Sequence, residues 1–197
     1  MNGLLKLSRG IDALNAWVGR WLCWLVLLMV LISAGNAIVR KLFSNSSNAF
    51  LEIQWYLFAA IFLLASGYTL LRNEHVKIDV VLGRFPRRTQ VKVEIFGLLV
   101  FLLPFVLYVG VLAWPEVQKA LISGEMSENA GGLIRWPVYA LLPSGMALLG
   151  LQGLSEVIKR LAFLAGLAPD PGLKQQAKSA EEELAELIRK QTERAAP

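Results

Sequence analysis

Few side chains in this sequence could carry out chemistry. His75 is its only histidine and Cys23 its only cysteine. A membrane-bound haem needs paired axial ligands, usually histidines on its helices, so a single histidine in a loop cannot hold one. The sequence also has no cysteine cluster, no glycine-rich phosphate loop and no Ser/His/Asp set. We therefore expect no catalytic residue, no bound cofactor, no metal site and no enzyme activity.

Carboxylates are the other candidates, because a proton or ion path across a membrane is normally built from ionisable side chains. Glu52, Glu94 and Glu156 all lie at the ends of long apolar stretches. The central portions of those stretches contain no Asp, Glu, Lys, Arg or His. A stand-alone four-helix exporter needs an acidic residue within a span, so we do not expect this chain to transport a substrate by itself.

Four apolar stretches make up most of the chain and predict an all-α, polytopic membrane protein. They cover residues 21–39, 50–71, 91–114 and 137–165. Each is long enough, because a helix crosses the hydrocarbon core in roughly 20 residues. The sequence is 55% hydrophobic with a mean hydropathy of +0.51, which is more apolar surface than a soluble fold of this length can bury. We expect four transmembrane helices within residues 21–165, preceded by a lead over residues 1–20.

The tail, residues 166–197, differs in character from the rest of the chain. The run from Pro169 to Gly172 should end the last transmembrane helix. Ser179 followed by Glu182 forms a capping box, which predicts a short amphipathic helix. Helices this short are marginal in water, so we expect a solvated cytoplasmic appendage. Binding to a partner or to the membrane surface is the alternative.

The distribution of Lys and Arg predicts the orientation. Of the 20 Lys and Arg residues, Arg40, Lys41, Lys119 and Arg135 are the only ones on the side opposite both termini. Because cytoplasmic segments carry the excess of Lys and Arg, the side that holds the other 16 is expected to be cytoplasmic. Both termini and the loop after residue 71 should be cytoplasmic. The net charge of +5 then reflects topology, and we expect no nucleic-acid partner.

Cleavage of the first stretch as a signal peptide is the alternative to a first transmembrane helix. Ser33-Ala34-Gly35 would be a weak small-residue cleavage site. The apolar run continues to Val39, however, and Arg40-Lys41 then resemble a stop. We therefore expect the first stretch to remain in the protein.

The six tryptophans are expected to anchor helix ends at the membrane interface, because an indole ring favours the headgroup region. Three lie on one helical face near the start of the first stretch, and the others lie at the opposite ends of the remaining stretches. They are Trp17, Trp21, Trp24, Trp55, Trp114 and Trp136.

Small and polar residues within the stretches should mark where helices pack on one another, since small side chains let backbones approach closely. The small residues are Gly67, Ser144, Ala147, Gly150 and Gly153. Gln152 and Ser155 should hydrogen-bond to neighbouring helices or to their own backbone. Pro104 should kink the third helix.

Two loops mix residue types in a way that favours contact with a partner. The loop after residue 71 places Arg72, His75, Lys77 and Asp79 among Val, Ile and Leu residues, so it should lie at the membrane surface or against a partner. The outer loop is glycine-rich and acidic, and we expect a partner to dock on it, with a plain turn as the alternative. Its docking residues would be Glu125, Ser127, Glu128, Gly131, Gly132 and Arg135.

These two loops, in this order on a four-span chain, carry a family resemblance. The matching segments are Tyr68 to Arg72 with His75 to Val80, Gly124 to Ser127, Gly131 to Leu133, Trp136-Pro137, Leu142 to Gly145, and Leu151 to Glu156. Over residues 21–161 the chain resembles the small membrane subunit of the tripartite ATP-independent periplasmic (TRAP) transporters. The family pattern has a proline soon after Leu133, where this chain has Ile134-Arg135. That departure places an arginine on the outer face.

The resemblance implies a location in the bacterial inner membrane and a function. In that family the small subunit pairs with a large membrane subunit that holds the substrate and sodium sites, and a soluble periplasmic binding protein delivers an organic acid. The small subunit is understood as a fixed scaffold that carries no substrate. We therefore expect a scaffold whose partners are the large subunit, the binding protein and the lipid bilayer. The alternative is a structural or assembly subunit of an unrelated membrane complex, and a more distant one is a stand-alone transporter.

Overall fold

The computed structural model describes residues 2–43, 48–73, 82, 84–129, 131–171 and 188–189. The elements in these ranges are α1 (Asn2–Phe43), α2 (Asn48–Arg72), α4 (Arg87–Gly97), the π-helical turn η1 (Leu98–Leu102), α5 (Leu103–Ser123) and α6 (Trp136–Leu164). The third long helix is continuous from α4 through η1 to α5. Four helices are long and apolar enough to cross a membrane, which confirms the all-α, four-span fold class.

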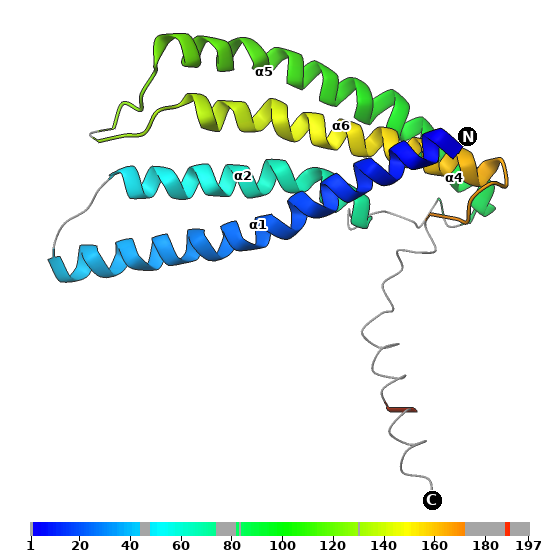
Figure 1. Cartoon of the computed structure of the whole chain (residues 1–197), viewed down its shortest axis with the longest axis horizontal. Coiled ribbons are helices and arrows are strands. Elements are labelled where there is room, and N and C mark those ends of the chain that lie inside the picture. The colour runs from blue at the N-terminus through cyan, green and yellow to red at the C-terminus, as the bar shows by residue number, and fades with distance from the viewer. Residues whose placement is uncertain are drawn as a thin grey trace, which may run out of the picture.

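The helices form one curved layer rather than a two-by-two bundle (Figure 1). Its order is α5, α6, α2 and α1, and each helix packs against the next. The N-terminal half of α1 also crosses onto α6. Helix α6 is therefore central. In its most apolar stretch of 18 residues 39% of the residues are buried, against 6% in the corresponding stretches of α1 and α2. Many large apolar side chains on these helices are exposed, as suits a protein surrounded by lipid or by a partner.

Helix α1 begins at Asn2, so the lead forms its first half and is not a separate segment. The buried positions in this half are Ser8, Ile11, Asn15 and Gly19, which are spaced by three or four residues and form one helical face. That face is largely polar, and it packs on other helices: Ser8 and Asn15 contact α6, and Gly19 lies against Tyr68 of α2. A hydropathy profile therefore does not distinguish it from a solvated lead.

Glycines allow the central helices to come unusually close. At Gly145 of α6 an added Cβ would lie 2.7 Å from the carbonyl oxygen of Leu63 in α2. At Gly67 of α2 it would meet the Oδ1 atom of Asn15 in α1, and it would lie 3.0 Å from the carbonyl oxygen of Leu148 in α6. Helices α1, α2 and α6 thus meet around Gly67, where a larger side chain has no space.

The third long helix changes its hydrogen-bond pattern beside Pro104. The amide of Leu103 donates to the carbonyl of Leu98, five residues earlier, which is the π-helical spacing. Pro104 has no amide hydrogen, so the α-helical ladder is interrupted at this point in any case. The disturbance expected at Pro104 therefore takes the form of a π-helical turn just before it. The tail helix expected after Ser179 lies outside the described residues, apart from Ile188 and Arg189.

Candidate functional site

The connection between α5 and α6 is an ordered hairpin at the loop end of the layer, the end opposite the N-terminus (Figure 1). Helix α5 is closed by Gly124 in the left-handed conformation, with φ of 62°, where glycine carries no Cβ penalty. Met126 and Ile134 then form an isolated antiparallel bridge. The amide of Ser127 donates to the carbonyl of Leu133 at 2.9 Å. The described residues of the outer loop are therefore paired with one another.

Glu52 of α2 holds this hairpin in place. Its carboxylate accepts from the Asn129 side-chain amide at 2.7 Å, from the Leu133 backbone amide at 2.7 Å, and from the Ser127 hydroxyl. The Tyr56 hydroxyl, one helical turn further along α2, donates to the carbonyl of Ile134 at 3.1 Å. Because hydrogen bonds to a charged carboxylate are strong, these three contacts assign Glu52 a structural role. The sequence alone placed Glu52 only at the end of a span.

The two acidic residues expected to dock a partner are not equivalent. Glu125 forms an ion pair with Arg135, in which the Arg135 Nη1 atom lies 3.2 Å from the Glu125 Oε1 atom. Arg135 also donates to the Tyr139 hydroxyl at 3.2 Å. That hydrogen bond, together with the Glu125 carboxylate, raises the pKa of Arg135. Glu128 is exposed and has no ion pair within the part of the chain that the structure describes, so it is the freer of the two charges.

A second polar assembly joins α1 to α6 at the N-terminal end of the layer. Asp12 of α1 accepts from the Ser155 hydroxyl at 2.7 Å and from the Gln152 side-chain amide at 2.9 Å, and the Lys159 ammonium lies 3.1 Å from its Oδ2. The Asn15 side-chain amide donates to Gln152 at 3.0 Å. Gln152 and Ser155 are 0% exposed. Their expected hydrogen bonds to a neighbouring helix are confirmed.

Ion pairs extend this assembly from α6 to α4. Glu156 is 2% exposed and pairs with both Lys159 and Arg160. Arg160 also reaches Glu94 of α4, with Nε 2.7 Å from Oε2. We refer to Asp12, Glu94, Glu156, Lys159 and Arg160 as the ionic cluster. Its members come from three helices, so it ties their ends together.

Arg87 and Asp170 extend the ionic cluster to the segment that follows α6. The Arg87 guanidinium makes a two-pronged contact with the Asp170 carboxylate, at 2.6 and 2.9 Å, and lies 3.3 Å from Glu94. The buried charged residues of the described ranges are Glu156, Arg160 and Asp170, and each has at least one ion pair. These paired charges thus join α4, the end of α6 and the segment after α6.

The ionic cluster was not foreseen as a site, although its spacing is visible in the sequence. Ser8, Asp12 and Asn15 lie on one face of a helix, as do Gln152 and Glu156 in the other. The two sets are far apart in the chain, with 140 positions between Asp12 and Gln152. A pattern within one helix gives no indication of that pairing.

The remaining predicted site residues are distributed along the layer. All six tryptophans are exposed. Gly150 and Gly153 face the third long helix, because an added Cβ would lie 3.1 Å from Val106 and 2.6 Å from Leu102. Ser144 and Ala147 are exposed and line an apolar groove between α5 and α6.

The loop after α2 is described only at its edges. The Arg72 guanidinium donates to the Tyr68 hydroxyl at 2.9 Å and lies 5.5 Å from the centre of its ring. His75, Lys77 and Asp79 lie outside the described residues. A role for these three in contact with a partner or with the membrane surface stays a prediction.

Comparison with known proteins identifies the family. A family model described as "Tripartite ATP-independent periplasmic transporters, DctQ component" matches residues 29–163. This range runs from the middle of α1 almost to the end of α6, and it includes the hairpin and most of the ionic cluster. Searches of curated proteins and of solved structures gave no match. The match covers more than half of the chain, which therefore belongs to the family of DctQ components of the tripartite ATP-independent periplasmic transporters.

Proposed function

We propose that this chain is the fixed scaffold subunit of a sodium-driven TRAP system that takes up an organic acid. It would support the large transport subunit in the bacterial inner membrane without carrying substrate itself. The observation that supports this proposal is that the buried charged residues of the described ranges are ion-paired. Glu156, Arg160 and Asp170 each pair with another residue of the chain. A transport path needs ionisable groups that can exchange partners.

The ionic cluster favours a rigid role. Removing one member of a buried ion pair typically costs about 3–5 kcal/mol, because the other charge is left uncompensated. Sliding α1 past α6 would separate Asp12 from Lys159 and from Ser155. Sliding α4 past α6 would separate Glu94 from Arg160. Movements of this kind are therefore costly, and a domain that moves during transport would have to lie elsewhere.

The open layer favours a large lateral partner. On α5 the side chains of Leu107, Tyr108 and Val111 are 66%, 70% and 73% exposed. Helices associate in a membrane through close packing and hydrogen bonds rather than through a hydrophobic drive. The exposed groove that contains Ser144 and Ala147, beside α5, offers small residues for such packing. We propose that the large subunit covers part of this layer.

The orientation follows the excess of positive charge, with both termini in the cytoplasm. The hairpin with its exposed Glu128 would then face the periplasm, where the binding protein arrives. Single cysteines at Asn73 and Asn129, in a Cys23→Ala background, would test this. A membrane-impermeant thiol reagent applied from outside should label the Asn129 position and leave the Asn73 position unlabelled. The reverse pattern would overturn the orientation.

Reconstitution tests the scaffold proposal itself. The purified chain in liposomes, given a sodium gradient and loaded binding protein, should take up no organic acid. Addition of the large subunit should produce uptake, and the large subunit without this chain should show little. Uptake by this chain alone would contradict the proposal.

A further inference from the structure

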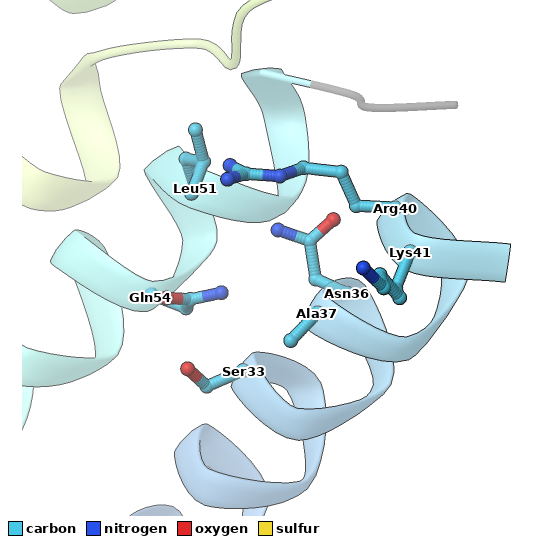
Figure 2. A pocket seen from close by; sticks show the side chains of 7 residues that line it. All are labelled: Ser33, Asn36, Ala37, Arg40, Lys41, Leu51 and Gln54. Atoms are coloured by element: carbon cyan, nitrogen blue, oxygen red, sulfur yellow. The ribbon is translucent and has the colours of Figure 1, made fainter. Parts of the chain in front are cut away.

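A pocket lies between α1 and α2 at the loop end of the layer. Its lining residues are Ser33, Asn36, Ala37, Arg40, Lys41, Leu51 and Gln54. Figure 2 shows the Arg40 side chain reaching from α1 toward Leu51 of α2, with the side-chain amides of Asn36 and Gln54 nearby on the two helices. The pocket therefore combines two cations with two amide groups.

No acidic side chain of the described ranges forms an ion pair with the two cations of this pocket. Neither Arg40 nor Lys41 has an ion pair within residues 2–43 or in the other described ranges. The neighbouring acid on α2, Glu52, is hydrogen-bonded to the α5–α6 hairpin instead. Residues 44–47, which link the two helices, are Ser, Asn, Ser and Ser and contain no acid. Both side chains are exposed, so an anion from outside the chain can reach them.

An apolar groove continues from the pocket along the same two helices. It is lined by Met29, Val30, Ser33, Ala34, Ala37, Gln54, Trp55 and Phe58. Ser33, Ala37 and Gln54 line both hollows, so the polar and apolar parts are continuous. From Met29 to Lys41 the helix rises about 18 Å, at about 1.5 Å per residue. The combined groove is therefore long enough for a headgroup and much of an acyl chain.

We propose that this groove binds an anionic phospholipid, with its phosphate at Arg40 and Lys41 and an acyl chain along Ala34 and Phe58. A guanidinium matches phosphate oxygens well because it presents paired N–H donors. The basic part lies at the helix ends, where headgroups are found, and the apolar part points toward the middle of the span. A free phosphate or a carboxylate substrate would leave the apolar part of the groove unused. The lipid would occupy the space between α1 and α2 and hold the two helices in the layer.

Native mass spectrometry of the purified full chain tests the proposal, using mixed micelles with phosphatidylglycerol or phosphatidylcholine as probes. The unaltered chain should retain phosphatidylglycerol in preference to phosphatidylcholine. The double variant Arg40→Gln with Lys41→Gln should bind phosphatidylglycerol at least about tenfold more weakly, because it removes both charged donors to the phosphate. Lys119→Gln is the matched control, since it removes an exposed charge near the loop end of the layer but from α5, and it should leave binding unchanged.

Two further arms separate the lipid from other occupants. Ala34→Phe fills the apolar groove without touching the cations, and it should weaken phosphatidylglycerol binding while Ala13→Phe, on an exposed part of α1, should not. Inorganic phosphate should fail to displace the lipid. Displacement by phosphate, equal retention of both lipids, or unchanged binding in the Arg40/Lys41 variant would each overturn the proposal. Circular dichroism on every variant checks that the helices are intact, so that a loss of lipid can be assigned to the groove.

Discussion

Asp12 of α1 and Lys159 of α6 form an ion pair with Nζ 3.1 Å from Oδ2, although they lie 147 positions apart in the chain. The same carboxylate accepts hydrogen bonds from Gln152 and Ser155 of α6. One carboxylate on the first helix is thus held by three groups on the last. This arrangement makes the polar first half of α1 part of the folded layer.

Asp12→Ala should destabilise the protein by about 1–3 kcal/mol. The substitution leaves the Lys159 ammonium without its α1 partner and removes an acceptor for the buried Gln152 and Ser155 side chains. The ion pair is partly exposed, so solvent screening reduces its contribution. Thermal unfolding of the purified chain in detergent would measure the loss. Lys6→Ala, at an exposed position of the same helix, is the control and should change the midpoint little. Equal effects of the two substitutions would show that Asp12 contributes no specific contact.

Gly67→Ala should also destabilise the protein, by about 1–3 kcal/mol, because the added methyl group overpacks a site that has no space for it. It would meet the Asn15 side chain and the carbonyl of Leu148, so α1, α2 and α6 would have to separate. Gly35→Ala is the matched control, since an added Cβ there meets nothing within 4 Å and alanine favours the helix. Unfolding midpoints should fall for Gly67→Ala and stay or rise for Gly35→Ala. A fall of the same size in both would contradict close packing at Gly67.

Glu52→Ala should loosen the α5–α6 hairpin without unfolding the helices. The substitution removes the acceptor of the Leu133 amide, the Asn129 side chain and the Ser127 hydroxyl. Hydrogen exchange should therefore become faster at the Leu133 amide, while amides within α6 stay protected. Glu116→Ala, which removes an exposed carboxylate from α5, should leave exchange in the hairpin unchanged. Unaltered protection of Leu133 in Glu52→Ala would argue against this role.

The hairpin predicts different results for its two acidic residues. Glu128→Lys should leave the complex assembled and weaken docking of the binding protein in a salt-dependent way, because Glu128 is exposed and such charges are screened. Glu125→Lys should in addition disturb the hairpin, since Glu125 pairs with Arg135. Uptake at several binding-protein concentrations and ionic strengths would measure both. A Glu128→Lys defect that no concentration relieves would make this residue structural, and unchanged uptake would make the hairpin a plain connection.

The four spans could be predicted from the sequence because hydrophobicity over about 20 residues is a local property. The role of the lead could not, since Ser8, Asp12 and Asn15 are polar residues whose partners lie on the last helix. A polar segment before an apolar stretch looks the same whether it is solvated or packed on a polar surface. Here the lead packs because α6 presents polar partners to it. No pattern within the lead itself reveals that those partners exist.

The hairpin and the third helix show the same limit. Glycines and acidic residues indicated a docking loop or a plain turn, and they gave no sign of the contact from Glu52, which lies 75 positions before Ser127. Pro104 indicated a disturbance of the third helix, and the sequence did not reveal that it would be a π-helical turn. Local signals thus located both features, and the form of the hairpin depends on a tertiary contact, that with Glu52.

Locking α1 to α6 in the assembled transporter tests the fixed-scaffold account most directly. The hydroxyl oxygens of Ser8 and Ser155 lie 2.7 Å apart, so Ser8→Cys with Ser155→Cys, in a Cys23→Ala background, should form a disulfide on oxidation. Mass measurement without reductant would verify the bond, and sodium-driven uptake would be compared before and after reduction. The account predicts equal uptake in the locked and reduced states, because these helices are not required to move. Uptake that is abolished by the lock and restored by reduction would contradict it.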